Sequence, residues 1–522
     1  MHWSERIARK VIERNPDKEE YVCAAGISPS GAVHVGNLRD ILTPYFVCKS
    51  LQKLGKKAKL LFSWDDFDRL RKVPVNVSNV VSGYEEYIGV PYAKIPCPFD
   101  ENETYASFFE KEFELGLKQL GLSFDVRYQS KEYLSGRYAS FVKLALEKRK
   151  EIYDILMSFK TQQANDEDRE NYYPVSVYCK HCTKDITKVI SYNEETHKLK
   201  YICKVCGKEE EVDVLEYFQI KLVWKVDWPM RWMVEGVDFE AGGIDHAASG
   251  GSYDVDRVLC EKIFNIKAPV FQGYGWLGFQ GVSSMHSSTG LNITLNNALK
   301  LYEPNILRWL FAKYDPKDAY DFYFDDTIIR HYTEFDRSLN NYLSETPDEQ
   351  IKDLFDICLI DPKNTKPKTP FGTVASIAPI VDFKLDKVIY CLNKAGVEFN
   401  EDSYDRLNKA EHWIKTYMPQ KMYKVLDSKN DEYISNLLEE DKITVRTIYN
   451  YLNENEIKEK EIQQFIYDTI NNPALTKKEN MQKQQHCFKV LYNLLFATDD
   501  GPRLYLFFAS CEKEKYLHLL NI

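Results

Sequence analysis

The sequence predicts an α/β protein in which a parallel sheet is split by an insertion and followed by an all-helical domain. Residues 21–25 read as a buried strand, residues 26–36 as a turn of small residues, and residues 38–48 as a helix with apolar side chains at helical spacing. A second glycine-rich turn of this kind begins at residue 241. From about residue 90 to residue 215 the alternation of strands and helices is lost, and beyond residue 338 only helical patterns remain.

The first turn is suited to bind phosphate. A strand that enters a glycine-containing turn and then a helix leaves backbone N–H groups unpaired beside the positive end of the helix dipole. His34 adds a hydrogen-bond donor for a phosphoryl oxygen, and Gly36 lets a base or ribose approach the backbone. The combination predicts nucleotide chemistry, although a glycine-rich turn with one polar histidine also occurs without any ligand.

Composition is that of an ordinary soluble protein of roughly two to four domains. The 522 residues carry a net charge of −10, so a nucleic-acid partner would depend on local basic patches and on shape. The 12 cysteines lack the density of a secreted disulfide scaffold, which favours the reducing cytoplasm. Trp3, Ile7 and Val11 share one face of an expected N-terminal helix, and no apolar run reaches membrane-spanning length.

Carboxylates follow the second predicted strand, residues 59–64. A strand, a helix and a second strand in this order indicate a parallel sheet, and such sheets bind ligands beyond the carboxyl ends of their strands. Asp65, Asp66 and Asp68 lie at that position and could hold a cationic substrate group. Alternatively, they cap the following segment or pair with the two arginines that come next.

The most specific local pattern lies inside the expected insertion, residues 91–215. Two Cys-x-x-Cys pairs, Cys179 with Cys182 and Cys203 with Cys206, are separated by twenty residues. Four thiolates at this spacing suit a tetrahedral zinc ion, and disulfides are the poorer explanation in a cytosolic chain. Because four protein ligands leave no open coordination position, the expected zinc ion is structural.

Aromatic and glycine-rich segments follow the insertion. Tryptophans recur every four residues from Trp224 to Trp232, as in one helical stripe, which Pro229 is expected to interrupt. The next segment, residues 241–254, again combines a strand end, glycines and a helix. It would supply the second half of a divided nucleotide-binding fold, in which Asp245 can accept hydrogen bonds from ribose hydroxyls.

Residues 29–37, PSGAVHVGN, resemble the HIGH signature of class I aminoacyl-tRNA synthetases, with residues 34–37 at its core. The order of further motifs narrows the resemblance to the class I lysyl-tRNA synthetases: FSWDDFDRLRKVP, the paired Cys-x-x-Cys, VWKVDWPMRW, GGIDHAASGGSYD and LYEPNILRWLFAKY. The resemblance covers essentially residues 1–337 and, less distinctly, the helical tail. It implies a Rossmann-type parallel sheet split by an insertion that contains the zinc ribbon, followed by an all-helical anticodon-binding domain.

The resemblance implies a ligase. Such enzymes activate L-lysine with ATP to lysyl-adenylate, release diphosphate, and transfer lysine to tRNA with release of AMP. ATP, Mg²⁺, a structural Zn²⁺ ion and tRNA are therefore the expected ligands and partners, and we expect a cytoplasmic monomer without membrane association.

The resemblance also implies site residues by their positions in the motifs. Catalytic roles are expected for His34, Asn37, Ser287 and Ser288. Contacts with ATP are expected for Pro29, Gly31, His34, Gly36, Asn37, Gly243, Asp245 and Met285. The lysine pocket would consist of Gly26, Ser28, Trp224, His246 and Tyr274, with Asp65 completing neutralisation of the ammonium group. Aromatic faces in such a pocket would cover the aliphatic stem of lysine and attract its charge.

The second class signature departs from the family pattern. Residues 283–290, SSMHSSTG, occupy the place of the KMSKS loop, but Ser284 and Thr289 stand where the family has lysine, and His286 where it has serine. Those lysines neutralise the pyrophosphate leaving group, so their absence predicts slower adenylate formation. A Ser/Gly-rich surface loop without a catalytic role is the alternative interpretation.

The resemblance divides the chain into five parts. They are the first half of the nucleotide-binding domain (1–90), the insertion (91–215), the second half (216–282), the signature-loop and stem-contact region (283–337), and the helical anticodon-binding domain (338–522). In the last part, a helical stripe is formed by Cys487, Val490, Leu491, Leu494 and Leu495. Lysines, His412 and Trp413 between residues 409 and 424 fit either an RNA-binding surface or a solvated helix face.

Two alternative functions remain open. A synthetase for another amino acid, such as glutamate or cysteine, would differ in its pocket, because a glutamate site requires arginine rather than aromatic and acidic residues. A catalytically weak paralogue that binds tRNA or adenylate for regulation would fit the altered signature loop. Amino-acid-dependent pyrophosphate exchange separates both alternatives from a lysine enzyme.

Overall fold

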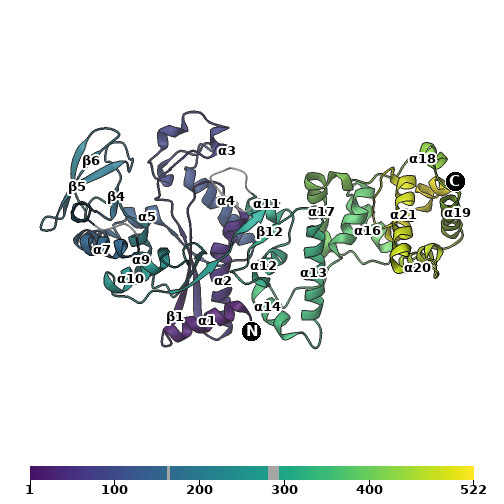
Figure 1. Ribbon diagram of the computed structural model, residues 1–522, viewed down its shortest axis with the longest axis horizontal. Coiled ribbons are helices and arrows are strands. Elements are labelled where there is room, and N and C mark those ends of the chain that lie inside the picture. The colour runs from purple at the N-terminus through teal and green to yellow at the C-terminus, as the bar shows by residue number, and fades with distance from the viewer. Residues whose placement is uncertain (161–164, 280–292) are drawn as a thin grey trace. The chain divides into compact units, whose positions relative to one another are not determined.

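The computed structural model describes residues 1–160, 165–279 and 293–522 (Figure 1). The chain forms two compact units. The first contains residues 1–299, 304–322 and 345–363, and the second contains residues 300–303, 323–344 and 364–522. Within the described residues, no helix is both long and apolar enough to cross a membrane.

A five-stranded parallel sheet forms the centre of the first unit, as predicted. Its strands are β1 (Glu20–Ile27), β2 (Lys57–Trp64), β3 (Asp125–Tyr128), β9 (Phe239–Gly243) and β10 (Val270–Tyr274). They lie in the order β10-β9-β1-β2-β3, so the strand order reverses between β1 and β9. This is the Rossmann-type arrangement, in which ligands bind at the carboxyl ends of the strands beside the reversal.

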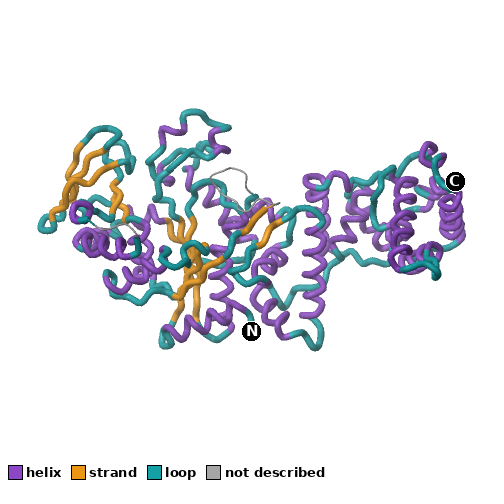
Figure 2. Tube along the Cα trace, viewed as in Figure 1, coloured by secondary structure: helices purple, strands orange, loops and turns teal. Residues whose placement is uncertain are grey.

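Helices pack on both faces of this sheet (Figure 2). They include α1 (Trp3–Arg14), α2 (Leu38–Lys53), α9 (Trp224–Glu235) and α10 (Ser252–Lys262). Trp228 of α9 packs in one cluster with Val22 and Ala24 of β1. Cys23, which lies between those two residues, forms a hydrogen bond with Cys48 of α2 instead. Because successive side chains of a strand point to opposite faces, α2 and α9 cover opposite faces of the sheet.

Helix α9 continues through Pro229, so the prediction that this proline interrupts the helix is wrong. A proline inside a helix removes one backbone hydrogen bond and crowds the preceding turn. Here the buried side chains of Trp228 and Trp232 hold the helix against the sheet on both sides of that position. The tryptophans therefore form the single helical stripe that their spacing indicates.

The insertion contains helices and antiparallel strands. Its helices are α4 (Tyr105–Gln119), α5 (Gln129–Leu134), α6 (Ala139–Glu147), α7 (Arg149–Ser158) and α8 (Asp166–Glu170), with the short α3 (Val75–Ser78) before them. Strand β4 (Val175–Val177) pairs with β8 (Ile220–Leu222), and β5 (Thr187–Asn193), β6 (Lys198–Cys203) and β7 (Glu209–Asp213) form a three-stranded antiparallel sheet. The same part of the chain also supplies β3 to the central sheet.

Buried Arg308 ties several segments of the first unit together. The chain after the second half of the sheet forms β11 (Leu277–Phe279), α11 (Leu295–Leu299), α12 (Pro304–Lys313), β12 (Tyr320–Phe322) and α14 (Glu349–Cys358). Arg308 of α12 donates to the carbonyl oxygens of Cys358 at 2.6 Å and Leu120 at 2.9 Å, and to the hydroxyl of Tyr45 at 2.9 Å. Its charge is thus surrounded by oxygen acceptors inside the fold.

The second unit is entirely helical, as predicted for the tail. Its helices are α13 (Thr327–Tyr342), α15 (Phe371–Ile377), α16 (Leu385–Lys394), α17 (Tyr404–Tyr417), α18 (Asp431–Ser435), α19 (Glu439–Glu454), α20 (Glu459–Ile470), α21 (Lys477–Phe496), α22 (Leu504–Ser510) and α23 (Leu517–Leu520). The stripe expected between residues 487 and 495 is the buried face of α21. It packs in one core with residues of α19, α20 and α22.

Candidate active site

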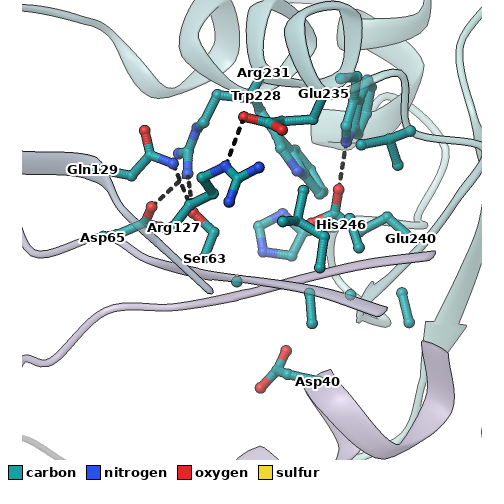
Figure 3. A pocket seen from close by; sticks show the side chains of 18 of the residues that line it. Asp40, Ser63, Asp65, Arg127, Gln129, Trp228, Arg231, Glu235, Glu240 and His246 are labelled. Carbon is teal, nitrogen blue, oxygen red and sulfur yellow. Dashed lines mark hydrogen bonds and ion pairs between the residues drawn. The ribbon is translucent and has the colours of Figure 1, made fainter. Parts of the chain in front are cut away.

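Most of the predicted amino-acid pocket comes together at the carboxyl ends of β1 and β9 (Figure 3). One cavity there is lined by Gly26, Asp65, Trp224, Gly243, His246 and Tyr274, all of which the sequence singles out. It encloses about 690 Å³ of space free of atoms, part of it open to solvent. Its position beside the strand reversal is the one that Rossmann-type sheets use for ligands.

Aromatic rings form one wall of this pocket. Trp224 and Trp228 of α9 stack with ring centroids 4.9 Å apart, and Trp228 lies 4.8 Å from Trp232. His246 meets the Trp228 ring edge to face at 5.6 Å. Trp224 is the most exposed of the three indoles, at 37%. Such a wall offers apolar surface to an aliphatic chain and ring faces to a cation.

Asp65 lies in the pocket, where its charge is already paired. The guanidinium of buried Arg231 donates to Asp65 at 2.6 Å and to Asp227 at 2.6 Å, and it also lies over the Trp224 ring. Burial opposes the charge of Arg231, but the carboxylates of Asp227 and Asp65 raise its pKa well above the usual value. The predicted carboxylate is therefore present but serves an internal ion pair.

Glu240 is a pocket residue that the sequence analysis missed. It lies on β9, is 7% exposed, and accepts a hydrogen bond from the indole N–H of Trp232. Burial raises the pKa of its carboxyl to about 7. In the view of Figure 3, Trp228 and His246 lie between Glu240 and the Asp65–Arg231 pair. The sequence does contain a signal for Glu240, since it is the one acidic residue in a strand of otherwise apolar and small residues, FEAGG. A charge in a buried strand needs a partner or a ligand.

Asp40 is the second missed residue. It lies in the first turn of α2 and also lines the pocket. The hydroxyl of Tyr274 donates to one of its oxygens, and the amide of Asn37 donates to the other at 3.3 Å. Burial raises the pKa of the Asp40 carboxyl to about 6, although both hydrogen bonds lower it. No motif includes Asp40, and its position three residues after Asn37 was the one available signal.

The first signature turn leads directly into α2. A short 3₁₀ turn, Val35–Asn37, precedes the helix, so the early N–H groups of α2 lie beside His34. The backbone N–H of Val35 donates to the carbonyl oxygen of Ile293 at 2.7 Å, and His34 forms an antiparallel bridge with Thr294. The backbone at residues 293–294, just after the second signature, is therefore bound to the backbone of the first signature turn.

Some predicted residues lie outside the pocket or outside the described chain. The hydroxyl of Ser28 contacts Tyr92, and neither Pro29 nor Gly31 lines the cavity. The Asp245 carboxylate lies 4.0 Å from His246 with its side chain 60% exposed, next to Gly243 at the pocket edge. The predictions for Ser284, Met285, His286, Ser287, Ser288 and Thr289 concern residues outside the described ranges.

The four cysteines of the two Cys-x-x-Cys pairs form one cluster. Their sulfur atoms all lie within 4.8 Å of one another. Cys179 and Cys206 are 3.7 Å apart between sulfurs, and Cys182 and Cys203 are 3.6 Å apart. A tetrahedron with zinc–sulfur bonds of about 2.3 Å has edges of about 3.8 Å, whereas a disulfide bond is about 2.05 Å long. The cluster thus fits a zinc ion bound by four thiolates.

The mixed basic and aromatic segment of the tail is not an aromatic surface. Trp413 is fully buried and donates its indole N–H to the carbonyl oxygen of Phe324 at 2.8 Å. Lys409 is also buried and pairs with Asp405 at 3.1 Å. The interpretation of these two residues as RNA contacts is therefore wrong, because the second unit uses them in its own core.

Comparison with known proteins shows that the chain matches one protein family. The model of the family described as "tRNA synthetases class I (K)" matches residues 1–358. The lysine–tRNA ligase of Thermococcus kodakarensis is 33% identical over 538 residues, covering 100% of this chain and 99% of the relative. Those of Treponema pallidum and Streptomyces coelicolor are each 31% identical, covering 100% and 96% of this chain and 98% and 95% of the relatives.

Proposed function

Because this chain belongs to the class I (K) tRNA synthetases, we propose that it is a lysine–tRNA ligase that makes lysyl-adenylate in the pocket between β1 and β9. The observation that carries the proposal is the family match, together with lysine–tRNA ligases that align along the whole chain. The chain would activate L-lysine with ATP and then transfer it to a tRNA.

Glu240 is the proposed partner of the lysine ε-ammonium. Among the other carboxylates that line the cavity, Asp65 is paired with Arg231, and Glu235 with Arg127 at 3.3 Å. Asp40 accepts hydrogen bonds on both oxygens, from Tyr274 and Asn37. Glu240 receives an indole N–H instead and so keeps its charge available to a ligand. A buried carboxylate without a cation beside it favours a cationic ligand, and the tryptophan wall would cover the four-carbon stem.

The same charges argue against glutamate as the substrate. The two arginines that line the pocket, Arg127 and Arg231, are each already paired with a carboxylate. A glutamate side chain would therefore meet Glu240 without a free guanidinium to neutralise it. Burying two like charges without a counter-ion is strongly unfavourable, so the pocket selects for a positive side chain.

ATP is proposed to lie against the first signature turn and the end of β9. The lysine carboxylate oxygen would form a bond to the α-phosphorus while the bond to the bridging oxygen of the β-phosphate breaks, and diphosphate leaves with that electron pair. His34 and the backbone N–H groups at the start of α2 would stabilise charge on the phosphates, with Asn37 beside them. Asp245 and Gly243 would receive the ribose. Mg²⁺ bound to ATP would neutralise part of the phosphate charge.

The remaining parts of the chain receive supporting roles. The four-cysteine cluster would hold a structural zinc ion and stabilise the insertion, proposed as residues 91–215. The helical tail, proposed as residues 338–522, would bind the anticodon of tRNA. The second-signature region, proposed as residues 283–337, would contact the acceptor stem of tRNA. The chain 1–90 and 216–282 would form the two halves of the nucleotide-binding domain.

Amino-acid-dependent pyrophosphate exchange tests the proposal. Purified protein is incubated with ATP, Mg²⁺ and labelled pyrophosphate, with lysine, glutamate, arginine or cysteine added separately. Exchange should depend on lysine, and aminoacylation of total tRNA with labelled lysine should follow. Exchange with glutamate or cysteine would refute the lysine assignment. Tight tRNA binding without exchange for any amino acid would instead favour the regulatory paralogue that the altered SMHSST loop suggests.

A further inference from the structure

We propose that Asp40 is a positioning residue for adenylate formation, because its one carboxylate joins the amino-acid pocket to the first signature turn. The inference rests on the proposed function, since it concerns the same reaction. Asp40 belongs to none of the residue sets that the signature motifs supply.

The two oxygens of Asp40 have partners from different parts of the site. Tyr274, at the end of β10, donates its hydroxyl to Oδ1 across 234 positions of sequence. Asn37, in the 3₁₀ turn before α2, donates its side-chain N–H to Oδ2 at 3.3 Å. Tyr274 lies in the proposed lysine pocket and Asn37 in the proposed ATP turn. A single side chain therefore connects the two halves of the divided sheet where two substrates have to meet.

The geometry favours alignment over binding as the role of Asp40. Tyr274 is 8% exposed and commits its hydroxyl to Asp40, so it presents mainly its ring to the cavity. Attack in line requires the lysine carboxylate and the α-phosphate to be held within a fraction of an ångström, and a misplacement of about 1 Å can cost about a hundredfold in rate. Loss of the anchor should therefore lower the rate of the chemical step more than it weakens the binding of either substrate.

Asparagine can replace this anchor almost isosterically. In Asp40→Asn, the amide oxygen still accepts the Tyr274 hydroxyl. The new NH₂ group then faces Asn37, whose Oδ1 has no hydrogen-bond partner among the residues that the structure describes. Rotation of the Asn37 amide by 180° presents that oxygen as the acceptor and restores the second bond. Alanine at position 40 removes both bonds.

The test uses the full-length enzyme and four variants: Asp40→Ala, Asp40→Asn, Tyr274→Phe, and Tyr253→Phe as a matched control. Tyr253, in helix α10, also donates its hydroxyl to a distant backbone group, the carbonyl oxygen of Pro269 just before β10 at 2.7 Å, and it has no bond to Asp40. Single-turnover adenylate formation and the KM values for lysine and ATP are measured for each variant, with thermal unfolding as a folding check. Asp40→Ala and Tyr274→Phe should lower the single-turnover rate about ten- to a hundredfold, with both KM values changed less than about threefold. Asp40→Asn should recover at least a third of the wild-type rate.

Other outcomes overturn the inference. A higher KM for lysine with an unchanged rate in Asp40→Ala would make Asp40 a lysine-binding group. If Asp40→Asn is as slow as Asp40→Ala, the reaction rate depends on the negative charge of Asp40 and not on its hydrogen bonds to Tyr274 and Asn37. If Asp40→Ala does not fold, an unaffected Tyr274→Phe enzyme would refute the proposal on its own. Absence of lysine-dependent exchange in the wild-type chain would instead refute the proposed function, which distinguishes the two failures.

Discussion

Replacement of Glu240 by glutamine gives the sharpest test of lysine recognition. The substitution keeps the size of the side chain and the acceptor for the Trp232 indole N–H, but it removes the charge that faces the cavity. Loss of one partner from a buried, hydrogen-bonded charge pair costs about 2 to 5 kcal/mol. At about 1.4 kcal/mol for each factor of ten, the KM for lysine in pyrophosphate exchange should rise ~30-fold to ~4,000-fold. The KM for ATP should stay within about twofold of the wild type.

The pH dependence of lysine binding gives the same test a second readout. Burial raises the pKa of the Glu240 carboxyl to about 7, so in the free enzyme the group is mostly protonated below that pH. Only the ionised form attracts an ammonium group. Affinity for lysine should therefore rise as pH increases toward about 7, by up to a factor of ten per unit, and then level off. This rise should be absent in Glu240→Gln.

Glu114→Gln is the matched control for this experiment. Glu114 accepts an indole N–H from Trp64 at 3.0 Å and a hydroxyl from Tyr128 at 2.8 Å, but it does not line the pocket. Its replacement tests the general effect of a neutralised, indole-bonded carboxylate on the fold. Equal lysine KM values for the wild type and Glu240→Gln, with both proteins folded, would remove Glu240 from the binding site and refute the reasoning.

Three further predictions concern metal, stability and the second signature. Purified protein should contain about one zinc ion per chain by elemental analysis, and Cys179→Ser should lose it and destabilise the insertion; metal-free protein with intact thiols would contradict this. The carboxylate oxygens of Asp256 lack hydrogen-bond partners among the described residues, and burial raises the pKa of this carboxyl to about 9. Because the unfolded chain loses this proton near pH 4 and the folded chain keeps it until about pH 9, the wild type should lose stability as pH rises between these values. Asp256→Asn should therefore be more stable at pH 8, with the gain shrinking by about 1.4 kcal/mol per unit toward pH 6 in denaturant titrations; a pH-independent difference would refute this. Ser284→Lys with Thr289→Lys should raise single-turnover adenylate formation by ~10- to ~100-fold with lysine affinity unchanged, and no gain would mean that other groups already stabilise the leaving group.

Local patterns were sufficient for most of the fold. The strands near residues 21–25 and 59–64, the helix at residues 38–48 and the stripe on α21 follow from apolar patterns, because these elements bury the side chains that form the patterns. Pro229 is the exception, because tertiary packing of Trp228 and Trp232 outweighs the helix-breaking tendency of proline. Similarly, Trp413 looks like a surface aromatic beside lysines until the core of the second unit is known.

The site was predicted unevenly for a related reason. Residues within recognisable motifs, such as Trp224 and His246, converge with Tyr274 on one pocket because the sheet topology brings strand ends together. Glu240 and Asp40 belong to no spacing rule. Glu240 matters because no cation among the described residues is paired with it, and Asp40 matters because it joins Tyr274 to Asn37. The same holds for Asp65, whose pairing with Arg231 joins residues 166 positions apart. Charge balance inside a pocket is a property of the folded chain, so the sequence could indicate its position and its residue types but not which carboxylate stays available.

The backbone contacts of the first signature bear on the altered second one. Val35 and His34 form backbone contacts with Ile293 and Thr294, the described residues that follow the SMHSST sequence. These contacts use main-chain atoms, so they do not depend on whether the signature carries lysine or serine. The chain has therefore lost the charges of the signature while keeping the anchor of its flank. Loss of the two positive charges predicts slow adenylate formation with normal substrate binding, because the lysines act on the leaving diphosphate and not on the bound substrates. Added lysines should restore that rate.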